Sequence, residues 1–166
     1  MAKFTGLAGV ANIITGTDFN DQIIGNDLDD ELNGGGLDDF ILGNRGNDFI
    51  RGQSGADTLY GGAGNDIIVG GHGADFLSGD AGSDTLTGNQ GSDTFSFNVR
   101  AGLLGDGVDF VTDFTLGFDR LSIANGSSSN VTFVQDGADI DVFYSGTQIA
   151  TLLNEVYTGT AADYFV

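Results

Sequence analysis

A nine-residue repeat constrains the possible folds of this chain more than any other feature. With Gly16 as the first position, nine units follow one another to Ser96 without insertion or deletion. They read GTDFNDQII, GNDLDDELN, GGGLDDFIL, GNRGNDFIR, GQSGADTLY, GGAGNDIIV, GGHGADFLS, GDAGSDTLT and GNQGSDTFS. A fixed period sustained over this length predicts a stacked array of identical structural units.

Four positions of the repeat carry the pattern. Position 1 is glycine in all nine units, and position 8 is always large and apolar. Position 4 is glycine in the last six units, whereas Phe19, Leu28 and Leu37 occupy it in the first three. A degenerate unit at residues 7–15 has Asn12 at position 6. In the nine units, position 6 is always aspartate: Asp21, Asp30, Asp39, Asp48, Asp57, Asp66, Asp75, Asp84 and Asp93.

These positions predict an all-β solenoid. An apolar residue between two outward-facing neighbours suits a very short strand with one side chain pointing inward. The other six residues must turn the chain, and glycine permits the positive φ angles and close approaches that turns require. Two units then make one coil of 18 residues. Stacked coils form two parallel sheets, about 4.8 Å between neighbouring strands, around a narrow apolar core.

Stacking places alternate aspartates on the same side of the solenoid. The Asp21 column contains Asp21, Asp39, Asp57, Asp75 and Asp93, and the Asp30 column contains Asp30, Asp48, Asp66 and Asp84. Carboxylates stacked at this spacing repel one another, and a hard divalent cation removes the repulsion. Calcium takes six to eight oxygen ligands and accepts backbone carbonyls, whereas magnesium retains its waters and zinc prefers His or Cys.

We therefore predict calcium ions between successive coils. Four gaps in one column and three in the other give about seven sites, and those preceding Gly43 are weaker because position 4 lacks glycine. His72, the sole histidine, is expected to be an exposed turn residue.

The pattern GGxGxD followed by x-apolar-x resembles the RTX (repeats-in-toxin, hemolysin-type) calcium-binding repeat. The resemblance covers residues 16–96 and implies a right-handed parallel β-roll, a β-helix solenoid of nonapeptide repeats. It also implies that each calcium is bound by position 6 aspartates and by carbonyls at positions 1 to 4. The implied glycine ligands are Gly43, Gly46, Gly52, Gly55, Gly61, Gly62, Gly64, Gly70, Gly71, Gly73, Gly79, Gly82, Gly88 and Gly91.

Composition narrows the choice of partners. Twenty-four acidic residues against five basic ones give a formal charge of −19, which argues against nucleic acid or anionic lipid and favours cations. A hydrophobic content of 40%, with 13 Phe, argues against a disordered acidic chain. No apolar run approaches the ~20 residues that cross a bilayer. Cysteine is absent, so disulfides cannot supply stability.

The predicted regions are an N-terminal segment at residues 1–15, the repeats at 16–96, and a C-terminal capping region at 97–166. Residues 108–123 resemble the stretch that follows the roll in serralysin-type domains and alginate-epimerase R-modules, and this implies Asp113 as a further calcium ligand. The strand-like runs 130–134, 139–145 and 147–153 are separated by QDGA and SG, which predicts antiparallel hairpins. Such a cap would close the end of the solenoid.

The resemblance implies a secreted calcium-binding module that folds on calcium binding after type I secretion. Residues 1–15 lack the features of a cleavable signal peptide, and residues 163–166 resemble the tail of serralysin-like substrates of the type I machinery. No catalytic motif is present in the sequence, so no enzymatic activity is expected. The alternatives are a calcium-dependent polysaccharide-binding accessory module and the C-terminal part of a secreted metalloprotease.

Outward-facing aromatic residues present a separate question. Phe40, Tyr60 and Phe76 fall on one outer face of the predicted roll. A row of exposed aromatic side chains on a sheet indicates that something covers or binds it. We expect the N-terminal segment or the C-terminal cap to cover this row. The alternative is a partner surface, for an extracellular polysaccharide or a cell surface.

Overall fold

The computed structural model describes residues 1–99, 107–126, 130–155 and 163–165, and its named elements are all β-strands. No helix in this part of the chain is long and apolar enough to cross a membrane. The strands are β1 (Lys3–Thr5), β2 (Ile13–Thr15), β3 (Gln22–Ile24), β4 (Glu31–Gly36), β5 (Phe40–Arg45), β6 (Phe49–Ser54), β7 (Thr58–Ala63), β8 (Ile67–His72), β9 (Phe76–Ala81), β10 (Thr85–Gln90), β11 (Thr94–Asn98), β12 (Asp109–Val111), β13 (Arg120–Ala124), β14 (Val131–Asp136), β15 (Asp139–Tyr144) and β16 (Thr147–Leu152).

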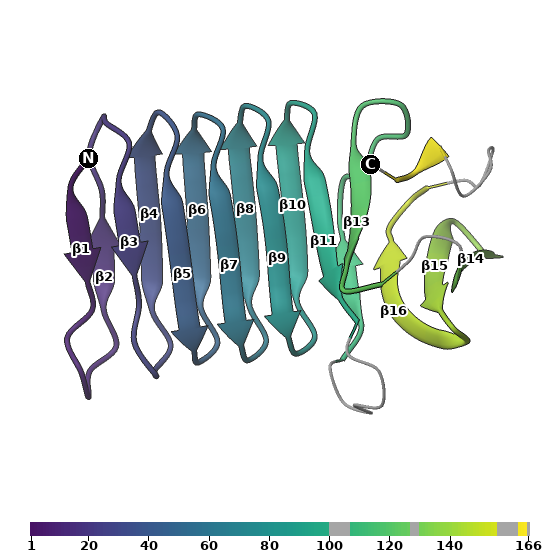
Figure 1. Ribbon diagram of the computed structural model, residues 1–166, viewed down its shortest axis with the longest axis horizontal. Coiled ribbons are helices and arrows are strands. Elements are labelled where there is room, and N and C mark those ends of the chain that lie inside the picture. The colour runs from purple at the N-terminus through teal and green to yellow at the C-terminus, as the bar shows by residue number, and fades with distance from the viewer. Residues whose placement is uncertain (100–106, 127–129, 156–162, 166) are drawn as a thin grey trace.

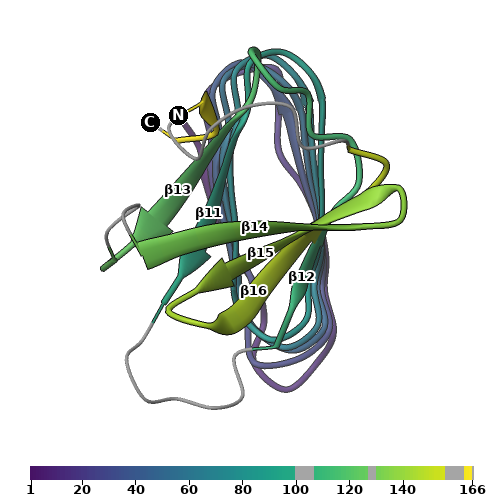
Figure 2. The ribbon, with the colours of Figure 1, turned by 90° about the vertical axis from the view of Figure 1, so that its right-hand side faces the viewer.

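The strands form two sheets that run the length of the molecule (Figure 1). One sheet has seven strands in the order β1-β3-β5-β7-β9-β11-β13, and the other has nine in the order β14-β15-β16-β12-β10-β8-β6-β4-β2. From β1 to β13, consecutive strands alternate between the sheets, so each coil contributes one strand to each. Figure 2, along the stack, shows the coils behind one another with the two sheets facing across a narrow interior. The predicted parallel β-solenoid is confirmed.

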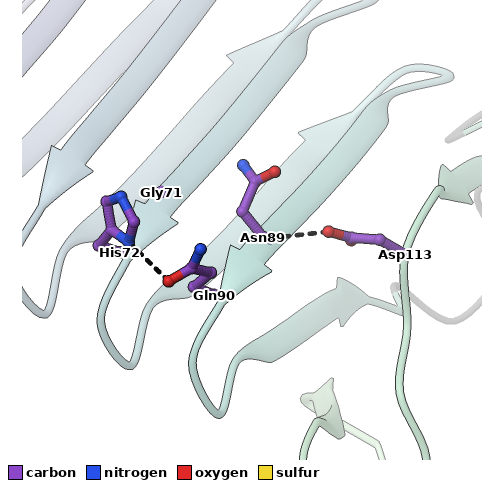
Figure 3. Close-up of a pocket in the computed structure, with 5 residues that line it drawn as sticks. All are labelled: Gly71, His72, Asn89, Gln90 and Asp113. Carbon is purple, nitrogen blue, oxygen red and sulfur yellow. Dashed lines mark hydrogen bonds between the residues drawn. The ribbon is translucent and has the colours of Figure 1, made fainter.

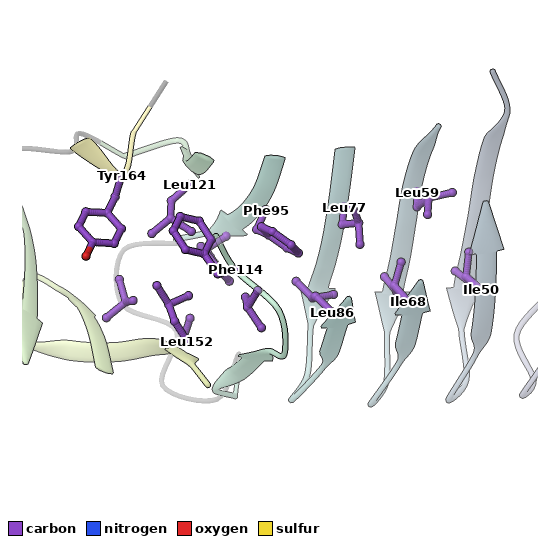
Figure 4. Packing of buried hydrophobic residues seen from close by; sticks show 14 of the residues in the cluster. Ile50, Leu59, Ile68, Leu77, Leu86, Phe95, Phe114, Leu121, Leu152 and Tyr164 are labelled. Atoms are coloured by element: carbon purple, nitrogen blue, oxygen red, sulfur yellow. The ribbon is translucent and has the colours of Figure 1, made fainter. Parts of the chain in front are cut away.

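The pairing register follows the 18-residue coil. Ile50 is paired with Ile68, and Leu59 with Leu77. Most strands in the repeats are six residues long and not three, because the first glycine-rich turn positions continue the pairing, as at Asn44 and Gly62. The position 8 side chains form a continuous buried row (Figure 4), and every one is 0% exposed: Ile23, Leu32, Ile41, Ile50, Leu59, Ile68, Leu77, Leu86 and Phe95.

Two adjacent isoleucines in β8 test the contribution of this row. Ile68 is fully buried, whereas Ile67 is 47% exposed on the outer face. Ile68→Ala is expected to lower the free energy of unfolding by about 2–5 kcal/mol, because it leaves a cavity in a narrow core. Ile67→Ala should cost less than about 1 kcal/mol. Guanidinium unfolding in excess calcium measures both, and equal losses would contradict the inward assignment of position 8.

The parallel sheets continue beyond the last nonapeptide. Val111 in β12 is paired with Leu86, and Leu121 in β13 is paired with Phe95, so a further coil stacks on the repeats. The side chains of Leu86, Val111 and Leu121 are fully buried. β16 then pairs in parallel with β12 and joins the C-terminal strands to the nine-stranded sheet. The region after Ser96 therefore begins by extending the roll, which the sequence period does not predict.

The last three strands form the predicted antiparallel hairpins. β15 pairs with β14 and with β16, and the turns between them contain Gly137 and Gly146, both with positive φ. An aromatic cluster fills the core at this end (Figure 4): Phe114 stacks on Tyr164 with ring centroids 5.7 Å apart, and Phe133 lies 4.5 Å from Tyr164. Tyr164, in the tail, is completely buried.

The predicted aromatic row lies on the outer face of the seven-stranded sheet. Tyr60 contacts Phe40 and Phe76, with ring centroids 5.8 and 5.6 Å apart, and all three side chains are half-buried. The N-terminal segment joins the sheet edges as β1 and β2, and the C-terminal strands extend the nine-stranded sheet. Within the described residues, neither segment provides the expected cover for this row.

Candidate calcium sites

The nine position 6 aspartates form two hydrogen-bonded columns at the turns, and each is at most 3% exposed. In both columns the backbone N–H of one aspartate donates to Oδ1 of the aspartate 18 residues later. The donor–acceptor distances in the Asp21 column are 2.7 Å (Asp21 to Asp39), 2.8 Å (Asp39 to Asp57), 2.8 Å (Asp57 to Asp75) and 2.9 Å (Asp75 to Asp93). In the Asp30 column they are each 2.7 Å (Asp30 to Asp48, Asp48 to Asp66 and Asp66 to Asp84).

Both columns continue into residues that the repeat pattern does not include. Asp84 donates its N–H to Oδ1 of Asp109 at 3.0 Å, and Asp93 donates to Oδ1 of Asp119 at 2.9 Å. At the other end, the N–H of Asn12 donates to Oδ1 of Asp30 at 2.6 Å. Neither Asp109 nor Asp119 is predicted by the nonapeptide pattern. Both could be recognised in the sequence because each lies two residues before an apolar residue, as position 6 lies before position 8: DFV at 109–111 and DRL at 119–121.

The second carboxylate oxygen divides eight of the nine aspartates into two groups, and Asp93 belongs to neither. In two early units Oδ2 is satisfied locally: Asp21 accepts the N–H of Thr17, and Asp30 accepts the N–H of Asn26, each at 2.7 Å. In six others Oδ2 is buried without a hydrogen-bond partner in the described structure: Asp39, Asp48, Asp57, Asp66, Asp75 and Asp84. A buried unpartnered anionic oxygen is costly, so these six need a compensating ligand.

The invariant glycines leave the space that this oxygen occupies. A Cβ placed on Gly61 would overlap Oδ2 of Asp66 and lie 2.8 Å from the carbonyl oxygen of Gly79, one coil further on. The same arrangement recurs at position 1 of the neighbouring units. An unpartnered carboxylate oxygen and a glycine carbonyl therefore converge at the turn. Oxygen donors of these two kinds fit a calcium ion.

Burial raises the pKa values of the column aspartates. Desolvation, with smaller contributions from neighbouring carboxylates, raises the pKa of Asp57 and of Asp66 to about 7. Burial also raises the pKa of Asp109 to about 8, and Asp84 beside it contributes. At Asp21, by contrast, a hydrogen bond from the Thr17 hydroxyl lowers the pKa. The six carboxylates with unpartnered oxygens are thus held in surroundings that disfavour their charge in the absence of a cation.

The turn residues that replace glycine in the first units are exposed. Phe19 is 66%, Leu28 41% and Leu37 54% exposed. Among the described residues, no three histidine or carboxylate side chains come together as a group able to hold a metal. A cation in these turns would therefore depend on backbone carbonyls as well as on aspartates.

A shallow depression lies where the repeats meet the following coil (Figure 3). His72 is exposed, as expected, and its Nδ1 lies 3.0 Å from Oε1 of Gln90. Asp113 takes the place of a position 1 glycine in the next coil. Its two oxygens accept the N–H groups of Gly88 at 2.9 Å and Asn89 at 2.7 Å. Backbone donors therefore already satisfy the carboxylate for which resemblance implied a calcium role.

Two solved structures are similar to this chain. No curated protein matches the chain. Among solved structures, the AlgE6R3 subunit of the Azotobacter vinelandii mannuronan C5-epimerase is similar, with 28% identity, 84% of this chain and 78% of that one covered, and a TM-score of 0.46. The extracellular lipase LipA from Serratia marcescens is 19% identical over 92% of this chain, with a TM-score of 0.37, and this chain covers 40% of it.

Family assignment therefore depends on the repeats themselves. The model of the RTX calcium-binding nonapeptide repeat matches four times, at residues 9–41, 33–68, 42–77 and 60–95. Together these matches span more than half of the chain. With the two aspartate columns and the parallel β-solenoid, they show that this chain belongs to the RTX calcium-binding repeat family.

Proposed function

We propose that this chain is a calcium-dependent folding module, with calcium ions between successive coils on both sides of the roll. The observation that carries the proposal is the set of six buried Oδ2 atoms without a hydrogen-bond partner among the described residues. Calcium would use these oxygens together with carbonyls of the glycine turns. The charge of the ion would offset the desolvation and mutual repulsion of the carboxylates.

The same observation supports about six sites, in place of the seven counted from the sequence. Each unpartnered oxygen marks one gap between coils, and the last of them, at Asp84, opens towards Asp109. The two gaps that begin at Asp21 and Asp30 are left out, because Thr17 and Asn26 already donate to the second oxygens there.

We further propose that the chain is exported unfolded by a type I machinery and folds outside the cell. Where calcium is scarce, carboxylate repulsion and the entropy of 29 glycines oppose folding. Where calcium reaches the ~10⁻⁴–10⁻³ M affinities of extracellular modules, binding free energy becomes folding free energy. Tyr164 in the tail is buried in the folded cap, so a secretion machinery would have to bind the tail before folding.

Calcium stoichiometry tests the folding module. Isothermal titration calorimetry of the chain is expected to show uptake of about six ions. Asp66→Asn keeps an acceptor for the N–H of Asp48 but removes a charged ligand, so it should reduce the uptake or weaken it about tenfold or more. Asp21→Asn is the matched control and should leave the uptake unchanged. Absence of calcium uptake, or equal losses in the two variants, would refute the proposal.

A second candidate function is binding of a polysaccharide. The aromatic row supports it, because Phe40, Tyr60 and Phe76 lie on an outer face where the neighbouring outward positions Leu42 and Thr58 carry no charge. Such a face favours an uncharged stacking partner over an acidic one. Binding assays with a neutral glucan and with alginate, each with and without calcium, distinguish an uncharged polysaccharide partner from an acidic one. A Tyr60→Ala variant that binds as well as the native chain would exclude this face.

A further inference from the structure

The two sides of the roll differ at position 5 of the repeat, next to the aspartates. On the side of the Asp30 column, the N–H of Asn47 donates to Oδ1 of Asp29 at 2.7 Å. The N–H of Asn65 donates to Oδ1 of Asn47 at 2.8 Å, and that of Ser83 donates to Oδ1 of Asn65 at 2.9 Å. Val108 continues the series with a 3.1 Å bond to Oγ of Ser83. We call this series the position 5 ladder.

The Asp21 column has no such series. Its position 5 residues include Asp38, Ala56, Ala74 and Ser92. The N–H of Ala56 donates to Oδ1 of Asp38 at 2.9 Å, but alanine offers no side-chain acceptor to the next coil. The ladder therefore cannot pass through Ala56 and Ala74.

The position 5 ladder orders the turns without adding charge to most of its steps. Asn47, Asn65 and Ser83 are neutral acceptors, whereas the aspartate columns gather negative charge on every coil. In the Asp30 column, two successive N–H groups of each such turn, at positions 5 and 6, are therefore held by side chains of neighbouring coils. These added hydrogen bonds stabilise the folded turn, so a lower calcium concentration is enough to fold it and fill its site.

We propose that Asn47, Asn65 and Ser83 are positioning residues that create two classes of calcium site in one roll. The sites of the Asp30 column fill at lower calcium concentration than those of the Asp21 column. This inference rests on the proposed calcium-binding function and deepens it, because it assigns an order of filling to sites that share the same ligand types.

Residue-resolved amide hydrogen exchange, followed by NMR across a calcium titration of the full chain, measures the order of filling. The N–H groups of Asp66 and Asp84 report on one column, and those of Asp75 and Asp93 on the other. The first pair should become protected at a calcium concentration about threefold to tenfold lower than the second, since one to two net hydrogen bonds separate the two columns.

Two double variants should shift the calcium midpoints of the two columns in opposite directions. Asn47→Ala with Asn65→Ala removes the two asparagine acceptors of the position 5 ladder and should raise the calcium midpoint of the Asp30 column to that of the Asp21 column. Ala56→Asn with Ala74→Asn supplies the missing acceptors and should lower the midpoint of the Asp21 column. None of the four positions has a positive φ, so both exchanges suit the backbone. A merely structural effect would shift both columns together.

The matched control places the same side chain elsewhere in the turn. Ala63→Asn with Ala81→Asn changes exposed position 3 residues on the side of the Asp30 column and should leave both midpoints in place. The inference is overturned if the native columns become protected at the same calcium concentration. It is also overturned if the control shifts a column as far as Ala56→Asn with Ala74→Asn does. Absence of any calcium-dependent protection would refute the proposed function itself, and this inference with it.

Discussion

Removing calcium with a chelator at neutral pH is expected to unfold the roll. Six buried carboxylates would then hold charge without a ligand on their second oxygens. A ligand that binds the native state alone contributes about 2.7 kcal/mol per site at a free concentration 100-fold above its Kd. Several such sites together match or exceed the ~5–15 kcal/mol by which domains are stable. The calcium-free roll therefore lacks most of its stabilising free energy.

Far-ultraviolet circular dichroism measures this transition. The β-sheet signal should be lost on chelation and recovered when calcium is added in excess. Magnesium at the same concentration is the control and should restore little, because it demands a tight octahedron and retains its waters. A spectrum that is the same with chelator and with calcium would contradict the prediction.

Protonation of the column aspartates at lower pH should partly substitute for calcium in stabilising the folded roll. The pKa of Asp57 and of Asp66 is about 7 in the roll, against 3.8 for an ordinary aspartate. The folded state therefore binds more protons than the unfolded state between these values, so its stability falls as pH rises through about 7. In chelator, lowering the pH from 8 to 5 should increase the β-sheet signal. In calcium, the same change should raise the calcium midpoint, because protons compete for the carboxylates.

The sequence predicts the repeats in detail because one period controls every contact. An 18-residue coil brings residues 18 apart into register, so burial of Ile68 and alignment of Asp48 with Asp66 follow from spacing alone. The antiparallel hairpins are also local, since glycine turns separate short alternating runs. The repeats and the hairpins can therefore be predicted without knowing which strands pair over long sequence distances.

The coil after Ser96 could not be predicted from the period. In the repeats, successive position 8 residues are nine apart, whereas Phe95 and Val111 are 16 apart and Val111 and Leu121 are ten apart. The place of this coil is set by non-local pairing of β13 with β11 and of β12 with β10. Asp109 and Asp119 therefore join the columns although no repeat identifies them.

The state of the second carboxylate oxygen depends on turn conformation and not on the aspartate itself. From the third unit to the ninth, position 2 has a positive φ, as at Gly35 with 117° and Asn44 with 85°. Thr17 and Asn26 do not, and their N–H groups point back to the aspartate of the same turn. Leu37 adopts a φ of 61°, and Asp39 in that third unit has an unpartnered Oδ2, as in the later units. Position 4 lacks glycine in the first three units, but the turn conformation differs from that of the later units only in the first two.

Gly61→Ala is expected to disable calcium binding at its turn although it adds a single methyl group. The added Cβ would overlap Oδ2 of Asp66 and lie 2.9 Å from its Cγ and 2.8 Å from the carbonyl oxygen of Gly79. The side chain of Asp66 is buried and tied through Oδ1 to the N–H of Asp48, so it cannot move aside freely. Overpacking of this kind costs about 1–3 kcal/mol, which corresponds to a calcium midpoint about fivefold to 100-fold higher.

Gly36→Ala separates this steric effect from the general effect of replacing glycine. Gly36 lies in β4 without a positive φ, and a Cβ there would meet its nearest atom, Cα of Asp18, at an ordinary 3.4 Å. The variant also keeps the N–H that donates to the Thr17 carbonyl at 3.0 Å. Its calcium midpoint, followed by circular dichroism, should stay within about twofold of the native value. If Gly36→Ala and Gly61→Ala raise the midpoint equally, the space at position 1 is not what the calcium sites require.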